Sequence, residues 1–129
     1  MNTTLIDTNI FLEILLNQEK KELCKDLLQE NIDNLSISDF SLHSIGVILL
    51  RNKKGKTFSK FLKDILPKIS ILTLTKEKYI EIIKFSKKYN LDFDDSYQAC
   101  LSVDKNLEII TMDKDFKKIA DLINVRYIS

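Results

Sequence analysis

The stretch "TTLIDTNIFLEILL", residues 3–16, places a short apolar segment directly before a helical pattern. "TTLI" (3–6) predicts a β-strand, and "NIFLEILL" (9–16) predicts a helix. The polar sequence Asp7-Thr8-Asn9 stands where the strand ends. A strand that passes through a polar junction into a helix is the repeating unit of parallel α/β sheets.

Short apolar runs and helical periods alternate over the whole sequence. Strands are predicted over residues 3–6, 35–37, 70–74, 107–111 and 124–128. Helices are predicted over residues 9–16, 20–31, 40–51, 58–66, 76–90, 94–105 and 114–122. This order predicts an α/β fold, a three-layer α/β/α sandwich with helices on both faces of a mainly parallel sheet of about four to five strands. A length of 129 residues suits one domain, 1–129.

Two of the predicted helices carry more detailed expectations. Thr57 stands before the apolar positions of helix 58–66 and is predicted to cap it. Helix 76–90 has apolar residues at helical spacing, which predict a buried stripe. The stripe consists of Tyr79, Ile82 and Ile83, with Phe85 as a further candidate.

Composition and charge favour a soluble globular protein, because 44% of the residues are apolar and 30% are charged. The net charge of +1 argues against a chain that is basic overall. One segment, "RNKKGKTFSKFLK" (51–63), is nevertheless basic and holds no acid. It is either a solvated loop and helix face or a contact for a polyanion. The predicted RNA-binding residues are Arg51, Lys53, Lys54 and Lys56.

Cysteine usage and the absence of targeting patterns predict a cytoplasmic protein. Cys24 and Cys100 stand far apart in helical patterns, and His43 is the only histidine, so reduced thiols are expected and a zinc site is disfavoured. The sequence contains no run of about 18 apolar residues, so no membrane span is predicted. The first residues also lack the basic start and small-residue cleavage site of a signal peptide.

Acidic and polar residues recur after the predicted strands, where ligands bind in parallel α/β sheets. Asp7 and Asn9 follow the first strand, and Asp39 follows the second. Thr111, Asp113 and Asp115 end or follow the fourth strand, and Asp94 and Asp95 begin the helix before it. Oxygen ligands without a Cys or His cluster favour Mg²⁺ or Mn²⁺. Such an ion lowers the pKa of water and stabilises charge on a phosphate, which suits phosphodiester hydrolysis.

Each of these acids also has a simpler interpretation, because carboxylates are favoured at helix starts as caps. We predict Asp7, Asp95 and Asp113 as the catalytic residues and metal ligands. We predict supporting roles for Asn9, Asp94, Thr111 and Asp115. Asp92 is interpreted as a turn or cap residue.

Three motifs in this order and spacing, the last of them "ITMDKDF" (110–116), resemble the PIN-domain family and in particular its VapC-like toxins. "LIDTNIFLEILL" resembles the opening strand and helix of the family, with Asp7 as its first acid. "DDSYQACLSVDKNLEIITMDKDF" resembles the later block, with Asp95 on a helix and Asp113 and Asp115 after a strand. The resemblance extends over essentially the full chain, as a single PIN-like domain. It implies Mg²⁺- or Mn²⁺-dependent cleavage of RNA, homodimers and inhibition by a cognate antitoxin.

The sequence departs from the family on the helix after the second strand, which usually carries a Glu. His43 and Ser44 stand about where that Glu belongs, and both are assigned supporting roles. The missing acid weakens the case for two metal ions. The first hypothesis is a metal-dependent endoribonuclease. The alternative, which the missing acid motivates, is a catalytically weak PIN-like module that binds RNA or protein. A phosphatase of the haloacid-dehalogenase type is disfavoured, because Asn9 stands where that family needs a second Asp.

Overall fold

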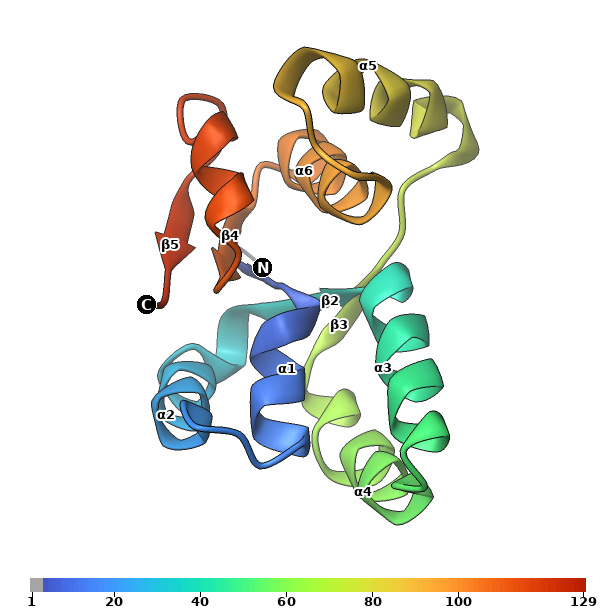
Figure 1. Ribbon diagram of the computed structural model, residues 1–129, viewed down its shortest axis with the longest axis vertical. Coiled ribbons are helices and arrows are strands. Elements are labelled where there is room, and N and C mark those ends of the chain that lie inside the picture. The colour runs from blue at the N-terminus through green and yellow to red at the C-terminus, as the bar shows by residue number, and fades with distance from the viewer. Residues whose placement is uncertain (1–3) are drawn as a thin grey trace.

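The computed structural model describes residues 4–129, in which five parallel strands form one sheet of order β3-β2-β1-β4-β5 (Figure 1). The strands are β1 (Thr4–Ile6), β2 (Leu35–Ser38), β3 (Ser70–Leu72), β4 (Glu108–Thr111) and β5 (Val125–Tyr127). Thr3, placed in the first predicted strand, lies outside the described residues, as do the first residues of the segment compared with a signal peptide. The predicted α/β class and mainly parallel sheet are confirmed.

Helices cover both faces of the sheet, so that the molecule has three layers (Figure 1). One face is covered by α1 (Thr8–Leu15), α2 (Lys21–Glu30), α3 (Asp39–Arg51) and α4 (Gly55–Asp64). The other is covered by α5 (Tyr79–Tyr89), α6 (Phe93–Lys105) and the 3-10 helix η4 (Lys114–Ile119). Three further 3-10 turns are η1 (Ile32–Asn34), η2 (Leu66–Lys68) and η3 (Lys76–Lys78).

The alternation of side chains along the central strands supplies both cores. On β1, Leu5 packs into the core under α5 and α6, and Ile6 packs into the core under α1 to α4. Ile109 and Ile110 on β4 divide in the same way. Successive residues of a strand point to opposite faces, so a two-sided sheet needs continuous apolar runs such as these.

Three predicted helices differ from those observed, and one of them, predicted over 76–90, begins with the 3-10 turn η3 before α5. The helix predicted over 114–122 is a 3-10 helix that ends at Ile119. The fourth α-helix begins at Gly55, so Thr57 lies inside it and does not cap it. The earlier start follows from packing, because the stacked rings of Phe58 and Phe61 hold the first turns of α4 against the core.

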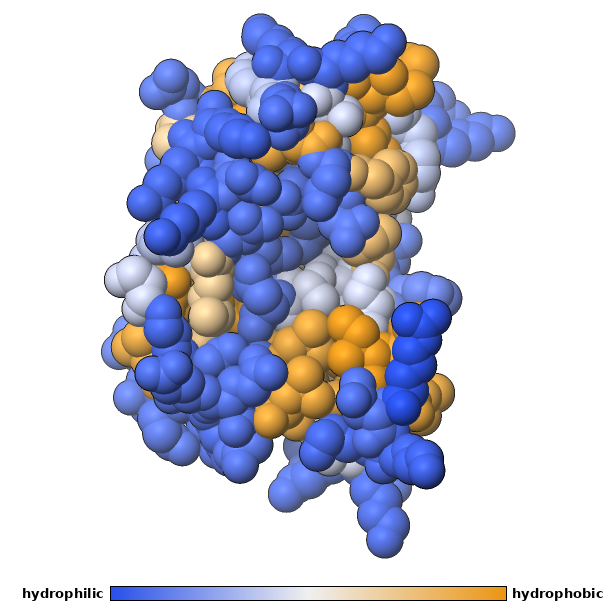
Figure 2. Space-filling view, in the orientation of Figure 1, coloured by the Kyte–Doolittle hydropathy of each residue, from blue (hydrophilic) through white to orange (hydrophobic). Residues whose placement is uncertain are grey.

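The buried stripe predicted for the fifth α-helix is wrong at Tyr79 and Ile83 and confirmed at Ile82, and the further candidate Phe85 packs partly buried against the same core. Ile82 is buried, whereas Tyr79 and Ile83 are about half exposed, at 46% and 52%. The face of α5 that packs on the core consists of Ile82, Phe85 and Tyr89. Figure 2 shows hydrophobic surface over α5 and a second such area between α1 and α3, on a face that is otherwise largely hydrophilic.

Among residues 4–129, no helix has the length and apolar composition needed to cross a membrane.

Tyr97 of α6 ties two strand ends together through its hydroxyl group. The hydroxyl donates to Asp39 Oδ1 at 2.6 Å and accepts from the Leu74 backbone N–H at 3.0 Å. Burial and the bond to Asp39 raise the pKa of Tyr97, so the hydroxyl keeps its proton. The ring itself is buried.

We expect Tyr97→Phe to lower the free energy of unfolding by about 1–3 kcal/mol, because it leaves the Leu74 N–H without its partner. Tyr89→Phe is the matched control, because Tyr89 contributes its ring to a contact with Phe85. It should change stability by less than about 0.5 kcal/mol. Urea denaturation of the two variants and the parent measures the difference, and equal stabilities would contradict the assignment.

Candidate metal centre

The carboxyl ends of β1 and β4 and the start of α6 meet at one edge of the sheet. Ile6 pairs with Ile110 in the parallel register, and the Asp7 N–H donates to the Ile110 carbonyl at 2.9 Å. This pairing places Asp7 beside Thr111, although the two residues are far apart in the sequence. The polar residues that follow the two central strands are thereby brought together, as the alternation of strands and helices predicts.

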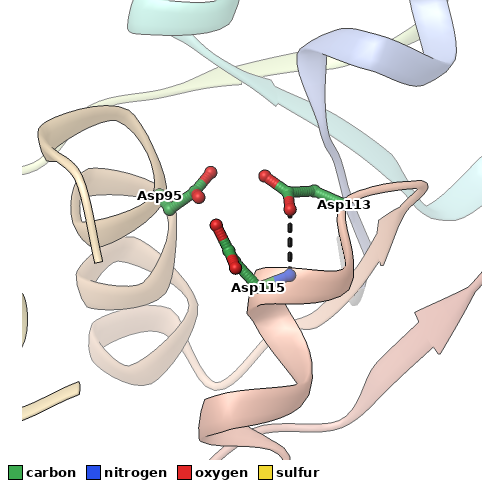
Figure 3. Close-up of side chains that lie close together, drawn as sticks. All are labelled: Asp95, Asp113 and Asp115. Atoms are coloured by element: carbon green, nitrogen blue, oxygen red, sulfur yellow. Dashed lines mark hydrogen bonds between the residues drawn. The ribbon is translucent and has the colours of Figure 1, made fainter. Parts of the chain in front are cut away.

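Three carboxylates gather at this edge, and Figure 3 shows them facing a common space. Oxygen atoms of Asp95, Asp113 and Asp115 all lie within 4.8 Å of one another. Asp95 comes from α6 and is buried, Asp113 is half-buried after β4, and Asp115 is exposed in the first turn of η4. The Asp115 N–H donates to Asp113 Oδ1 at 2.9 Å, which fixes the second and third acids relative to each other (Figure 3).

The acids at the start of α6 divide into separate roles. Asp92 is the N-cap, and its Oδ1 accepts from the Asp95 N–H at 2.9 Å. Because Asp92 satisfies the helix start, the Asp95 side chain is free to face Asp113 and Asp115. Asp94 is exposed and lies outside the three-carboxylate group.

Burial and mutual repulsion raise the pKa of the central acid. The pKa of Asp95 rises from 3.8 to about 8, first through burial and then through the charge of Asp113 and a hydrogen bond to that side chain. The charges of Asp92 and Asp7 raise it further. Asp95 thus keeps its proton below about pH 8 in the absence of a cation, and a bound cation would favour its ionised form.

Asp7 lies beside this group and is held by three donors. Its Oδ1 accepts from the Thr8 N–H at 2.8 Å and from Gln98 Nε2 at 3.2 Å, and its Oδ2 accepts from the Thr111 hydroxyl at 2.7 Å. Burial raises the pKa of Asp7, and these three hydrogen bonds act against that rise. Asp7 therefore combines the capping role with a place in the site, and the two interpretations are not exclusive.

Thr111 connects Asp7 to Asp113. Its hydroxyl donates to Asp7 and accepts from the Asp113 N–H at 2.9 Å. Asn9 supports the same corner, since its Nδ2 donates to Thr111 Oγ1 at 3.5 Å and its Oδ1 accepts from the Met112 N–H at 3.2 Å. The structure thus places Asn9 and Thr111 where they can orient the acids.

Gln98 and Ser41 belong to the site but are absent from the predicted residues. Gln98 Nε2 donates to Ser41 Oγ at 2.8 Å as well as to Asp7, and both side chains are buried. A polar residue three positions after Asp95, in an otherwise apolar stretch of helix, is the only sequence signal for Gln98. Ser41 has no such signal, because a serine near a helix start is common.

Other predicted residues lie apart from the carboxylates. His43 is exposed and Ser44 is half-buried on α3, and neither hydrogen-bonds to an acid of the site among the residues described. The predicted RNA-binding residues are all exposed around the end of α3 and the start of α4. They are Arg51, Lys53, Lys54 and Lys56. A helix of this length spans about 20 Å, so these cations begin roughly that far from the strand end.

An all-parallel sheet between two helical layers, with carboxylates gathered at the ends of its central strands, defines a three-layer α/β protein with an acidic centre. Within that class the chain belongs to the PIN domain family, whose model matches residues 4–122. The predicted family is therefore confirmed. No match to curated protein sequences reaches significance.

Solved structures share this fold over nearly the whole chain. VapBC2 from Rickettsia felis, bound to a DNA fragment from its promoter, aligns with a TM-score of 0.79 and 18% identity, covering 97% of this chain and 98% of that chain. FitAcB from Neisseria gonorrhoeae gives 0.75 and 24% over 96% of both chains. VapC20 from Mycobacterium tuberculosis, a sarcin–ricin loop cleaving toxin, gives 0.77 and 14% over 96% of this chain and 99% of that chain. At these identities the likeness establishes the fold.

Proposed function

We propose that the protein is a Mg²⁺- or Mn²⁺-dependent endoribonuclease and the toxin of a toxin–antitoxin pair. The observation that carries this proposal is the group of Asp95, Asp113 and Asp115 at the strand ends of a PIN domain. The similarity to VapC20, a sarcin–ricin loop cleaving toxin, supports RNA as the substrate class. Hydrolysis of a phosphodiester is the reaction proposed for the site.

The residues present fit a divalent cation. All donors are carboxylate oxygens, which Mg²⁺ and Mn²⁺ prefer over the Cys and His ligands of zinc sites. Burial, and after it the charge of Asp113, raise the pKa of Asp95, and a bound cation would offset both effects. Asp95 and Asp113 would hold the ion, Asp7 would face it from β1, and Asp115 completes the group. When bound, the ion lowers the pKa of a water molecule and neutralises charge on the phosphate.

The protein's own side chains prepare this chemistry by holding the acids in place. Thr111 joins Asp7 to Asp113, and Asn9 secures Thr111 against the Met112 backbone. Asp92 holds the start of α6, which presents Asp95. Because these hydrogen bonds fix the carboxylates in advance, the site does not need to reorganise when substrate binds.

The basic segment supports the choice of a polyanion as substrate. Its exposed cations stand beyond the far end of α3. We propose that they hold RNA backbone away from the scissile bond, which makes binding weaken as salt rises.

A toxin–antitoxin complex from Klebsiella pneumoniae, which shares the fold with a TM-score of 0.75, supports a protein partner. A groove of about 340 Å³ between α1, α2 and α4 is lined mainly by apolar side chains, including Phe11, Leu28 and Phe61. Such a groove suits an apolar segment of a cognate antitoxin. The exposed Ile80 and Ile83 on α5 offer a separate apolar surface for the proposed homodimer.

We expect the purified protein to cleave mixed RNA when Mg²⁺ or Mn²⁺ is added and to stop when the ion is chelated. Asp7→Asn should lower the rate by about 100-fold or more, because it removes a carboxylate that would face the bound ion. The assay compares parent and variant over time with each ion and with EDTA. Cleavage by Asp7→Asn at the parent's rate would refute the proposed site.

The alternative is a catalytically weak binding module, and it is motivated by α3, where His43 and Ser44 stand about where the resemblance leads us to expect a Glu. The same assay decides between the two functions. RNA binding without cleavage at millimolar Mn²⁺ would establish the module.

A further inference from the structure

Gln98 is a buried polar residue whose two amide hydrogens point at functional groups. Its side chain is 1% exposed, and its Nε2 lies 3.2 Å from Asp7 Oδ1 and 2.8 Å from Ser41 Oγ. Within residues 4–129, Gln98 Oε1 is buried without a hydrogen-bond partner. Leaving a buried carbonyl unpaired is costly, so the orientation of this amide is governed by its donors.

The Gln98 amide connects the two helical layers, on opposite faces of the sheet, beside Asp7. Gln98 belongs to α6 on one face of the sheet, and Ser41 belongs to α3 on the other. Ser41 Oγ is itself fixed, because it accepts from the Thr8 hydroxyl at 2.7 Å and hydrogen-bonds to the Ser38 hydroxyl at 3.1 Å. The hydrogen bond to Ser41 therefore fixes the Gln98 amide in the orientation in which it contacts Asp7.

The bridge holds Asp7 without adding charge. Three other carboxylates already face one another nearby, and Asp7 adds to their repulsion. An acidic side chain at position 98 would repel Asp7 and would add a further negative charge. An apolar side chain would leave Asp7 Oδ1 with the Thr8 N–H as its single donor.

We propose that Gln98, anchored on Ser41, is a positioning residue that holds the Asp7 carboxylate toward the Asp95–Asp113–Asp115 group and so raises the affinity of the site for a divalent cation. This inference rests on the metal site of the proposed function. It does not require that RNA be the substrate.

The test is a calorimetric titration of the full chain with Mn²⁺ in the absence of RNA. Gln98→Met keeps the volume and removes the donors, and we expect it to raise the Kd for Mn²⁺ about tenfold, as loss of a group that orients a ligand does. Ser41→Ala removes the anchor and should raise the Kd by a smaller factor. Gln98→Met combined with Ser41→Ala should be no weaker than Gln98→Met alone, because both act through one bridge.

Ser102→Ala is the matched control, because Ser102 is also fully buried on α6 and its hydroxyl has no partner among the described residues. Its Kd should stay within about twofold of the parent's, and urea unfolding of every variant shows that each is folded. A second readout is RNA cleavage by Gln98→Met, which excess Mn²⁺ should restore to near the parent's kcat.

The outcomes separate this inference from the proposed function. Weaker Mn²⁺ binding by folded Gln98→Met supports the inference even where the parent cleaves no RNA, which would refute only the ribonuclease. Parent-like Mn²⁺ affinity in both Gln98→Met and Ser41→Ala would overturn the inference while leaving the ribonuclease intact. A parent that binds no Mn²⁺ at millimolar concentration would overturn both.

Discussion

Replacing Asp95 by Asn is expected to reduce RNA cleavage by about 1000-fold or more, which corresponds to about 4 kcal/mol of lost transition-state stabilisation. Asp95 is the buried member of the three-carboxylate group, and its oxygen atoms face both Asp113 and Asp115. The amide has nearly the same shape but no charge. It therefore removes the attraction for a divalent cation while leaving the fold of α6 intact.

Asp94→Asn is the matched control for this prediction, because Asp94 is the preceding residue in the same helical turn and is exposed. It should change the rate by less than about threefold, since surface charges act weakly across solvent. Initial rates at saturating Mn²⁺ compare the two variants with the parent. Equal losses in both variants would mean that general negative charge at the helix start, and not a ligand at position 95, supports cleavage.

The sheet and most of the acids at its edge can be predicted from the sequence. The alternation of strands and helices is enough to predict the sheet and the edge at which Asp7, Asp95 and Asp113 meet. Asp115, predicted as a supporting residue, is the third carboxylate of the observed group. Its position depends on the tight 3-10 turn that follows β4, whereas the sequence pattern predicts an ordinary helix there.

The residues that the sequence does not reveal owe their roles to tertiary contacts. Gln98 and Ser41 are far apart in the chain and meet only because the start of α6 lies at the same edge of the sheet as the start of α3, which follows β2. Hydrophobic periodicity also does not say which side of α5 meets the core, so Tyr79 and Ile83 are mispredicted as buried. That choice depends on how α5 lies across α6, which is a long-range property.

Without metal, the folded protein is expected to lose stability as the pH rises from about 4 to about 8, through the acid at position 95. The pKa of Asp95 is 3.8 in the reference state and about 8 in the folded protein. The folded protein therefore binds this proton more tightly than the unfolded chain does. Stability from this group is complete below about pH 4 and is lost as the pH approaches the folded pKa.

Asp95→Asn cannot ionise at this position, so in EDTA at pH 8 we expect it to be more stable than the parent by about 2–4 kcal/mol. Urea unfolding at pH 5 and pH 8 measures the change, and Asp121→Asn, at an exposed position, serves as the control. Identical pH dependence in the parent and Asp95→Asn would show that the buried carboxylate ionises at no cost.

Adding Mn²⁺ at pH 8 should reverse the order of stability. A cation that binds only the folded state stabilises the parent in proportion to its concentration over the Kd, and the Asn variant gains little because it lacks a ligand. The same substitution is thus expected to abolish cleavage and to stabilise the metal-free fold. A purely structural Asp95, one that caps α6 or supports packing, would instead lose stability on substitution under both conditions. The sign of the change in EDTA therefore distinguishes an acid held for cation binding from an acid held for the fold.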